Sequence, residues 1–259
     1  MTTNSSKDSE LQITKDGSHT LYSNRFEQHY HNPNGAVAES KHNFFEANGL
    51  YDALKQKKEI TILEVGFGTG LNLLLLLDAL ADVKSRPAIN YYSIEAYPID
   101  ACTAESFNFH EHVNHPKLAE KLSHIFGPLH KGINSFELLA GFNAYILNGF
   151  FRDFSPDENL QADFIFHDAF SPDVNSELWT ADTFEKLKSF SDTDCILTTY
   201  SAASKAKGAM AAAGWHLAKT RGALGKREMT LASLNPDKLA GFERVNEERL
   251  ARRYEEGDF

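Results

Sequence analysis

The pattern of apolar and polar positions along the chain predicts an α/β fold. Short apolar runs rich in branched and aromatic residues indicate strands, and longer segments with apolar residues at helical spacing indicate helices. The expected strands are residues 59–65, 89–97, 162–170 and 194–202, with strand pairs at 134–150 and 215–234. The expected helices are residues 36–48, 70–80, 98–110, 115–126, 177–190 and 204–214. Such alternation produces a mixed, mainly parallel sheet covered on both faces, in which we expect seven strands.

By composition the chain divides into three parts. Residues 1–50 combine a polar arm with the first expected helix, residues 51–235 hold the α/β domain, and residues 236–259 form a charged tail. Ligands of such sheets bind at the carboxyl ends of the strands. We expect the arm and its helix to cover that edge, whereas the sequence gives no indication of what the tail contacts.

Charge and composition narrow the class of protein. The chain has 26 lysine and arginine residues against 36 aspartate and glutamate residues, a formal net charge of −10, so any nucleic-acid partner must be held by a local basic patch. No apolar run approaches the ~20 residues that span a bilayer, and the polar first residues contain no apolar signal core. The two cysteines show neither metal nor disulfide spacing. These features predict a cytoplasmic protein without a membrane contact or a metal.

The turn after the first strand of the α/β domain has the pattern of a nucleotide site. In ILEVGFGTGLNLLLLL, Gly66, Gly68 and Gly70 separate the strand from a leucine-rich helix. Glycines allow positive φ angles and a close approach of the backbone to a ligand, and the helix N-terminus offers free N–H groups to an anion. Glu95, near the end of the next strand, is placed to accept hydrogen bonds from both hydroxyls of a ribose.

The details of this turn favour S-adenosyl-L-methionine over a dinucleotide. The third glycine comes one residue earlier than in G-x-G-x-x-G, no lysine follows, and the acidic Glu64 precedes the turn. A carboxylate at that position suits a ligand with a cationic amine and a sulfonium, and we expect Glu64 near the amino group. The alternatives are a tight turn that binds nothing and a Glu64 that serves only as a structural acceptor.

Asp168 is the candidate catalytic residue, because it ends a buried strand at the ligand edge of the sheet. A carboxylate there can orient an acceptor amine and take up its proton, although an aspartate before a turn often only bonds the turn. Trp179 and Phe170 are candidates to stack on a flat base, or are core aromatics. His167 points to the opposite face of the strand and is expected in the core.

Two further polar clusters are candidate binding elements. The stretch KTRGALGKREMTL contains four basic residues, of which Lys226 and Arg227 are the candidate phosphate contacts; the alternative is a solvated loop with a salt bridge to Glu228. The stretch HYHNPNG contains His29 and His31, but no third ligand lies at metal spacing, so we expect surface or loop histidines.

Several stretches together resemble the methyltransferase half of the MnmC-type family, which synthesises 5-methylaminomethyl-2-thiouridine in bacterial tRNA. They are TLYSNRFEQHYHNPNGAVAESKHNFFEANGL, ILEVGFGTGLNLLLLL, YYSIEAYP, HDAFSPDVNSELWT and GKREMTLA. The resemblance implies a Rossmann-like class I methyltransferase that transfers a methyl group from S-adenosyl-L-methionine to the aminomethyl nitrogen of a tRNA wobble uridine. By this resemblance Asp168 lies near the reaction centre, and the cofactor positions are Gly66, Phe67, Gly68, Gly70, Asn72 and Glu95.

The chain departs from this family pattern in two ways. Many relatives have Gly-Asp after the fourth strand, whereas LNGFF places Phe150 there, so the adenine contact is either an aromatic wall or Asp153. No second glycine fingerprint is present, so the resemblance implies a methyltransferase without the oxidoreductase half. Other enzymes would then install the aminomethyl group that this protein methylates. The alternatives are a methyltransferase of a small amine, an aminopropyl transferase and a pure binding module.

Overall fold

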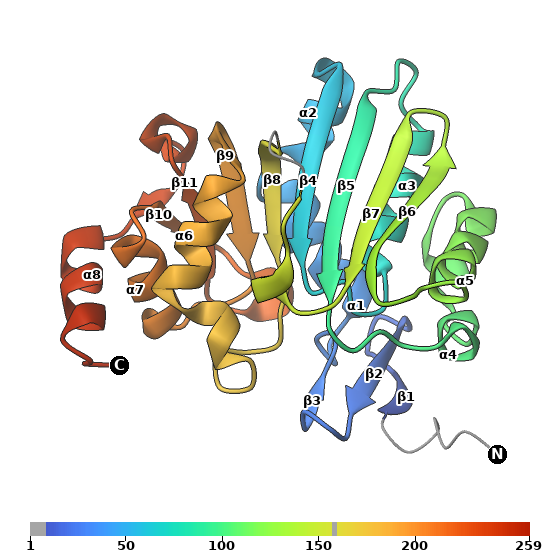
Figure 1. Cartoon of the computed structure of the whole chain (residues 1–259), viewed down its shortest axis with the longest axis horizontal. Helices are drawn as coiled ribbons and strands as arrows, with labels where there is room; N and C mark the ends of the chain where they lie inside the picture. Colours follow the sequence, from blue (N-terminus) through green and yellow to red (C-terminus); the bar gives the residue numbers. More distant parts are fainter. Residues whose placement is uncertain (1–8, 157–159) are drawn as a thin grey trace.

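The computed structural model of the protein describes residues 9–156 and 160–259, and a mixed sheet runs through its centre (Figure 1). Its strand order is β12-β10-β11-β9-β8-β4-β5-β7-β6. The strands are β4 Glu59–Val65, β5 Ala88–Glu95, β6 Gly132–Leu139, β7 Phe142–Asn148, β8 Ala162–His167, β9 Ser191–Thr199, β10 His216–Thr220, β11 Met229–Ser233 and β12 Glu243–Arg244. Strands β7, β5, β4, β8 and β9 are parallel to one another, while β6, β11 and β12 each pair antiparallel with a neighbour.

The α/β class and the mixed, mainly parallel sheet are confirmed, but the expected count of seven strands is wrong, because this sheet has nine. The segments expected as strands already amount to eight, and the ninth is β12, which with β6 forms the two edges of the sheet. Strand β6 is the outer half of the hairpin expected at 134–150, and β12 has only two residues and no apolar pattern that a sequence could reveal. Without these edges the order is β7-β5-β4-β8-β9-β11-β10, with the strand order reversing between β4 and β8.

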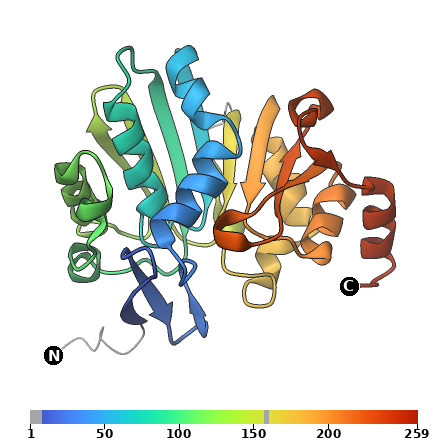
Figure 2. The ribbon, with the colours of Figure 1, turned by 180° about the vertical axis from the view of Figure 1, so that it is seen from behind.

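Helices cover both faces of the sheet. They are α1 Ala36–Lys41, which continues into a π-helix at His42–Glu46, α2 Leu50–Gln56, α3 Leu71–Ala81, α4 Ala101–Glu105, α5 Glu120–Phe126, α6 Ala181–Ser189, α7 Ser204–Ala212 and α8 Glu247–Glu255. Helices α6 and α7 lie on the face seen in Figure 1, and α1, α2 and α3 on the face seen in Figure 2. No helix in the described parts of the chain is long and apolar enough to cross a membrane.

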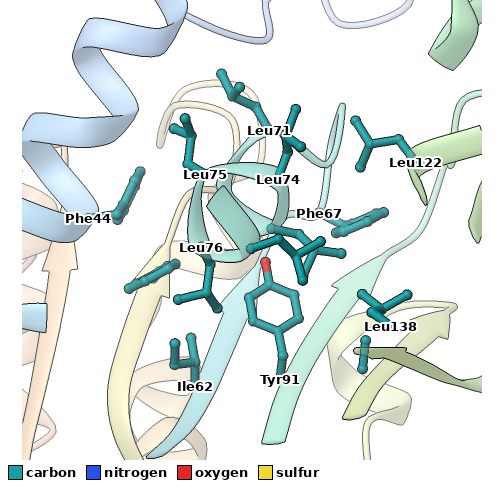
Figure 3. Close-up of a cluster of buried hydrophobic side chains, with 14 of the residues drawn as sticks. Phe44, Ile62, Phe67, Leu71, Leu74, Leu75, Leu76, Tyr91, Leu122 and Leu138 are labelled. Atoms are coloured by element: carbon teal, nitrogen blue, oxygen red, sulfur yellow. The ribbon is translucent and has the colours of Figure 1, made fainter. Parts of the chain in front are cut away.

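Strand residues alternate between two apolar cores, one on each face of the sheet. Ile62 of β4 packs in the core under α3, whereas the adjacent Leu63 packs in the core under α6 and α7. Figure 3 shows the first of these cores, with the leucines of α3 above Ile62 and Tyr91. Nearly every side chain of α3 is buried, which explains why the sequence shows a leucine run rather than an amphipathic helix.

The N-terminal segment forms a small three-stranded sheet of β1 Ser9–Ile13, β2 His19–Ser23 and β3 Gln28–His29. It lies beyond the ends of the central strands, at the lower side of Figure 1. The chain then passes His31, whose Nε2 lies 2.8 Å from Thr69 Oγ1 in the glycine turn, before it enters α1. The N-terminal segment is therefore joined to the carboxyl edge of the sheet.

The charged tail packs against the α/β domain. Helix α8 contacts α7 closely, because a Cβ atom on Gly208 of α7 would lie 2.9 Å from the Tyr254 side chain. The Tyr254 hydroxyl accepts a hydrogen bond from the backbone N–H of Ala181 at 3.2 Å. Leu250 and Tyr254 join the core under α6 and α7. The division into three domains remains a prediction, but the contact of the tail, which the sequence did not indicate, is helix α7.

Candidate active site

A cavity of about 800 Å³ lies at the carboxyl ends of the central strands. Its size is typical of ligand sites, which range over roughly 300–1,000 Å³. The cavity is lined by the glycine turn, the segments after β5, β7 and β8, and residues 26–34 of the N-terminal segment. Of the site residues predicted from sequence, Gly66, Phe67, Gly68, Asn72, Glu95, Phe150, Asp168 and Lys226 line it. Glu64, Gly70, Trp179 and Arg227 are not among the lining residues.

The glycine turn keeps the floor of the cavity open. Gly66 has a φ of 97°, and a Cβ atom there would lie 2.7 Å from the backbone oxygen of Asp168. A Cβ atom on Gly68 would lie 3.2 Å from the Tyr30 ring across the cavity. Gly70 faces the core instead, where a Cβ atom would meet Leu122 at 2.8 Å. It is also the N-cap of α3 and has no side chain to cap the helix, so the first N–H groups of α3 are available to an anion.

Glu95 joins the end of β5 to the glycine turn. Its Oε2 accepts a hydrogen bond from the backbone N–H of Gly68 at 2.9 Å, and its Oε1 accepts one from the N–H of Tyr97 at 2.8 Å. Burial raises the pKa of this carboxyl, and the backbone N–H groups of Tyr97, Gly68 and Ala96 partly offset that rise. Each carboxylate oxygen has a second lone pair, so Glu95 can still accept from the hydroxyls of a ligand.

Asp168 lies beside the turn and shares a hydrogen-bond donor with Glu64. Asn72 Nδ2, in the first turn of α3, donates to Asp168 Oδ2 and to Glu64 Oε1, both at 2.9 Å. Glu64 is buried and does not line the cavity. Its carboxylate therefore contacts protein groups, and not the amino group of a ligand as the sequence led us to expect. Burial, followed by the charges of Glu64 and Glu39, raises the pKa of Asp168 well above its usual value.

The aromatic residues at the opening differ in their exposure. Phe150 lines the cavity and is 41% exposed, with the Arg152 guanidinium 4.7 Å from its ring centre and Tyr97 edge-on at 5.9 Å. Asp153, the other residue considered for an adenine contact, is not among the lining residues. Phe67 packs its ring on Phe126 in the core, with 5.2 Å between the ring centres. Its backbone, between Gly66 and Gly68, is therefore the part that can face the cavity.

Of the two aromatics considered for base stacking, Phe170 lines the cavity and Trp179 does not. Trp179 is 2% exposed, its indole N–H donates to the Phe170 carbonyl at 2.8 Å, and its ring contacts His167 at 4.3 Å. Of the two alternatives considered for Trp179, the structure therefore favours a core aromatic over a residue that stacks on a base. His167 is in the core as expected, and burial lowers its pKa to about 4.

Two of the four basic residues in and beside the basic loop before β11, Lys219 and Lys226, form internal ion pairs. Lys219 contacts Glu228 at 3.7 Å and Glu243 at 3.0 Å. Lys226 reaches the cavity, where its Nζ lies 2.7 Å from Glu39 of α1. Both predicted phosphate contacts are exposed, Lys226 at 40% of its side chain, but Arg227 has no place in the cavity lining.

The sequence interpretation missed the contribution of the HYHNPNG segment. Tyr30, His31 and Asn32 all line the cavity. His31 is in a loop, as expected, but it lies against the glycine turn, and burial lowers its pKa to about 4. The N–H of Asn32 donates to Glu39 Oε2 at 2.9 Å, which joins this segment to α1. The available signal was the unusual density of histidine, asparagine and tyrosine in the segment.

Comparisons with known proteins agree with this architecture. A family model described as S-adenosyl-L-methionine-dependent methyltransferase matches residues 114–235. The tRNA 5-methylaminomethyl-2-thiouridine biosynthesis bifunctional protein MnmC of Burkholderia multivorans is 31% identical over 84% of this chain and 34% of its own length. MnmC of Leptospira interrogans is 31% identical over 83% of this chain and 34% of its own length. The chain thus spans about a third of the length of these curated relatives.

A solved structure extends the likeness to the fold. The crystal structure of MnmC2 from Aquifex aeolicus matches with a TM-score of 0.75 and 27% sequence identity, covering 95% of this chain and 75% of that one. With the glycine turn at the reversal of strand order, the fold and the matches make this chain a member of the S-adenosyl-L-methionine-dependent methyltransferases. Within that class it is similar to the MnmC proteins named above, as the sequence resemblance predicted.

Proposed function

We propose that this chain transfers a methyl group from S-adenosyl-L-methionine to the 5-aminomethyl nitrogen of a tRNA wobble uridine. The observation that carries the proposal is the cavity in which Asp168 and the glycine turn face the same space. The relatives named above act, by their names, in tRNA 5-methylaminomethyl-2-thiouridine biosynthesis. The proposal implies action in the cytoplasm, where tRNA is modified, and an upstream reaction that installs the aminomethyl group.

The residues present fit S-adenosyl-L-methionine. A side chain on Gly68 would extend toward Tyr30 across the cavity, and one on Gly66 would displace the turn from the Asp168 backbone. Asn72 Oδ1 is buried in the cavity lining and has no hydrogen-bond partner among the described residues, so it is available to a ligand N–H group. The N–H groups at the start of α3 would hold the carboxylate of the methionine moiety, Glu95 the ribose, and Phe150 would lie against the adenine. When bound, this cofactor supplies a methyl group activated by a positively charged sulfur.

The protein's contribution to the chemistry is to position and deprotonate the amine. An amine attacks only through a neutral nitrogen lone pair, and the methylated nitrogen carries a positive charge until it loses one of its protons. Asp168 would accept a hydrogen bond from the amine, orient it and take the proton. The raised pKa of Asp168 suits this role, because a more basic carboxylate is a better proton acceptor.

The direct test is methyl transfer from labelled S-adenosyl-L-methionine into tRNA isolated from cells that lack this protein. We expect labelled 5-methylaminomethyluridine or its 2-thio derivative after nucleoside analysis. Binding of the labelled donor without incorporation into tRNA would reject tRNA as the substrate. It would instead favour a small amine, which the internal pairing of the basic loop would then explain.

Charge reversal in the basic loop tests the contact with tRNA. We expect Arg227→Glu to weaken tRNA binding and to reduce the slope of log K against log salt by about one, because a phosphate contact is lost. Arg249→Glu is the matched control, because Arg249, like Arg227, is exposed and outside the cavity lining, but it lies on α8 and not in the basic loop. Binding curves at several salt concentrations make the comparison, and an equal effect of the two variants would show that Arg227 makes no specific contact.

Lys226→Glu should act differently from Arg227→Glu. It would place a carboxylate against Glu39, 2.7 Å from the present Lys226 nitrogen, and so disturb the cavity wall. We therefore expect this variant to weaken binding of the cofactor as well as of tRNA. Calorimetric titration with S-adenosyl-L-methionine distinguishes the two sites, since Arg227→Glu should leave cofactor affinity unchanged.

A further inference from the structure

Two buried side chains connect the sheet to Asp168. Glu64 is next to last in β4 and 1% exposed, and Asn72 is the second residue of α3 and 4% exposed. We propose that Glu64, acting through Asn72, fixes the orientation and the proton affinity of the Asp168 carboxylate. Glu64 is then a positioning residue, since it does not line the cavity. The inference rests on the proposed function only in that Asp168 is taken to accept a proton from the substrate amine.

One amide group joins the two acids. Asn72 Nδ2 donates to Glu64 Oε1 and to Asp168 Oδ2, both at 2.9 Å. An amide nitrogen carries two hydrogens, so these two contacts use its full donor capacity. A rotated amide would place its carbonyl oxygen against both carboxylates. The paired acids therefore determine which way Asn72 faces, and Asn72 in turn holds one oxygen of Asp168.

Glu64 is itself fixed from the neighbouring strand. Its Oε2 accepts hydrogen bonds from the Tyr91 hydroxyl at 2.5 Å and from Ser93 Oγ at 2.7 Å, and both residues are buried on β5. Figure 3 shows the Tyr91 ring among the apolar side chains under α3, with its hydroxyl group toward that helix. A continuous set of hydrogen bonds thus runs from β5 through Glu64 and Asn72 to Asp168.

The same contacts set an electrostatic balance around Asp168. The polar and charged groups that act on it are Glu64 of β4, Asn72 of α3, Glu39 of α1, Lys226 of the loop before β11, Tyr91 of β5 and Tyr200 after β9. Glu64 and Glu39 raise the pKa of Asp168, and Asn72 and Lys226 lower it. Burial raises the pKa of Glu64 itself to about 7. Removing the charge of Glu64 should therefore make Asp168 a weaker base.

Glu64→Gln removes this charge and keeps the hydrogen-bonding shape. The glutamine oxygen can still accept from Asn72, and its nitrogen can donate to the hydroxyl oxygens of Tyr91 and Ser93. Asp78→Asn is the matched control. Asp78 is a buried carboxylate on α3, the helix that also carries Asn72; it accepts a hydrogen bond from the N–H of Asn114 at 3.0 Å and lies outside the cavity lining. Ser93→Ala is a milder second variant, because losing one donor makes Glu64 easier to protonate.

The experiment is a carbon-13 NMR titration of the aspartate carboxyls, with the Asp168 signal assigned by its loss in Asp168→Asn. We expect the Asp168 midpoint to fall by about one pH unit in Glu64→Gln, to fall by less in Ser93→Ala, and to stay unchanged in Asp78→Asn. An unchanged midpoint in Glu64→Gln, or an equal shift in Asp78→Asn, would overturn the proposal. The titration requires no acceptor, so it decides this question even if wild-type protein methylates no tRNA.

The pH dependence of methyl transfer provides the functional comparison. If Asp168 must be ionised to take the proton, the rate falls on the acid side as Asp168 becomes protonated. We expect this acid limb to move to lower pH in Glu64→Gln, in step with the titration, and to stay in place in Asp78→Asn. A titration shift without a shift of the acid limb would show that Asp168 is not the group that limits the rate in acid.

Discussion

Methyl transfer should fall by about 10²- to 10⁴-fold when Asp168 is replaced by asparagine, while affinity for S-adenosyl-L-methionine changes little. Asparagine has the shape of aspartate and can still accept the hydrogen bond that Asn72 donates to Oδ2 at 2.9 Å. It cannot take a proton from the amine. The loss should therefore appear in the rate of the chemical step, measured in single turnovers with bound cofactor.

The pH dependence of the Asp168→Asn variant is a second, independent test of whether Asp168 takes the proton from the amine. Without the carboxylate, the amine must lose its proton to water before it can react. The residual rate should then rise with pH until the free amine is neutral in solution. Wild-type protein should instead reach its plateau at lower pH, once Asp168 itself is ionised.

Asp173→Asn is the appropriate control for Asp168→Asn. Asp173 lies five positions further along the same connection, is exposed and does not line the cavity, so the same change of charge should leave the rate within about twofold. A variant Asp168→Asn that retains more than about a tenth of the wild-type rate would mean that the carboxylate only bonds the turn, and that water removes the proton.

Gly66→Ala should abolish binding of S-adenosyl-L-methionine. The new methyl group would lie 2.7 Å from the Asp168 backbone oxygen, and rotating a side chain cannot relieve this contact, because Gly66 and Asp168 directly follow the paired strands β4 and β8. The φ of 97° adds backbone strain of about 1–3 kcal/mol for a residue other than glycine. We expect lower thermal stability and no measurable heat of cofactor binding in a calorimetric titration.

Gly141→Ala separates these two causes. Gly141 lies in the β6–β7 turn with a φ of 77°, and nothing lies within 4 Å of the position of its Cβ atom. This variant should therefore lose stability through the backbone angle alone and bind the cofactor normally. Equal loss of cofactor binding in both variants would indicate general destabilisation rather than displacement of the glycine turn from Asp168.

The sequence predicted the centre of the fold better than its edges. Strand β4 occupies the expected residues 59–65, and α3 begins one residue after the expected start, because a dense apolar run and a glycine turn are strong local signals. Strand β12 has two exposed residues, Glu243 and Arg244, and depends on its pairing with β10. Such a strand has no apolar pattern of its own, so local sequence does not reveal it.

The candidate site divides in the same way. Gly66, Gly68 and Glu95 line the cavity as predicted, because their positions follow from strand ends and backbone geometry, which sequence spacing encodes. The inward position of Lys226 depends on Glu39, and that pairing depends on the packing of α1 beside a distant loop. The burial of His31 likewise depends on contact with Thr69. Contacts of this kind arise from tertiary structure and leave no periodic signal.

The ion pair between Glu39 and Lys226 also bears on how the protein is made. These residues are 187 positions apart in the chain, and together they form part of one cavity wall. Contacts between distant segments close long loops and form late in folding. During synthesis, the strands from β4 to β9 can emerge and begin to pair before Lys226 leaves the ribosome. The cavity at the carboxyl edge of the sheet should therefore be among the last parts of the nascent protein to be completed.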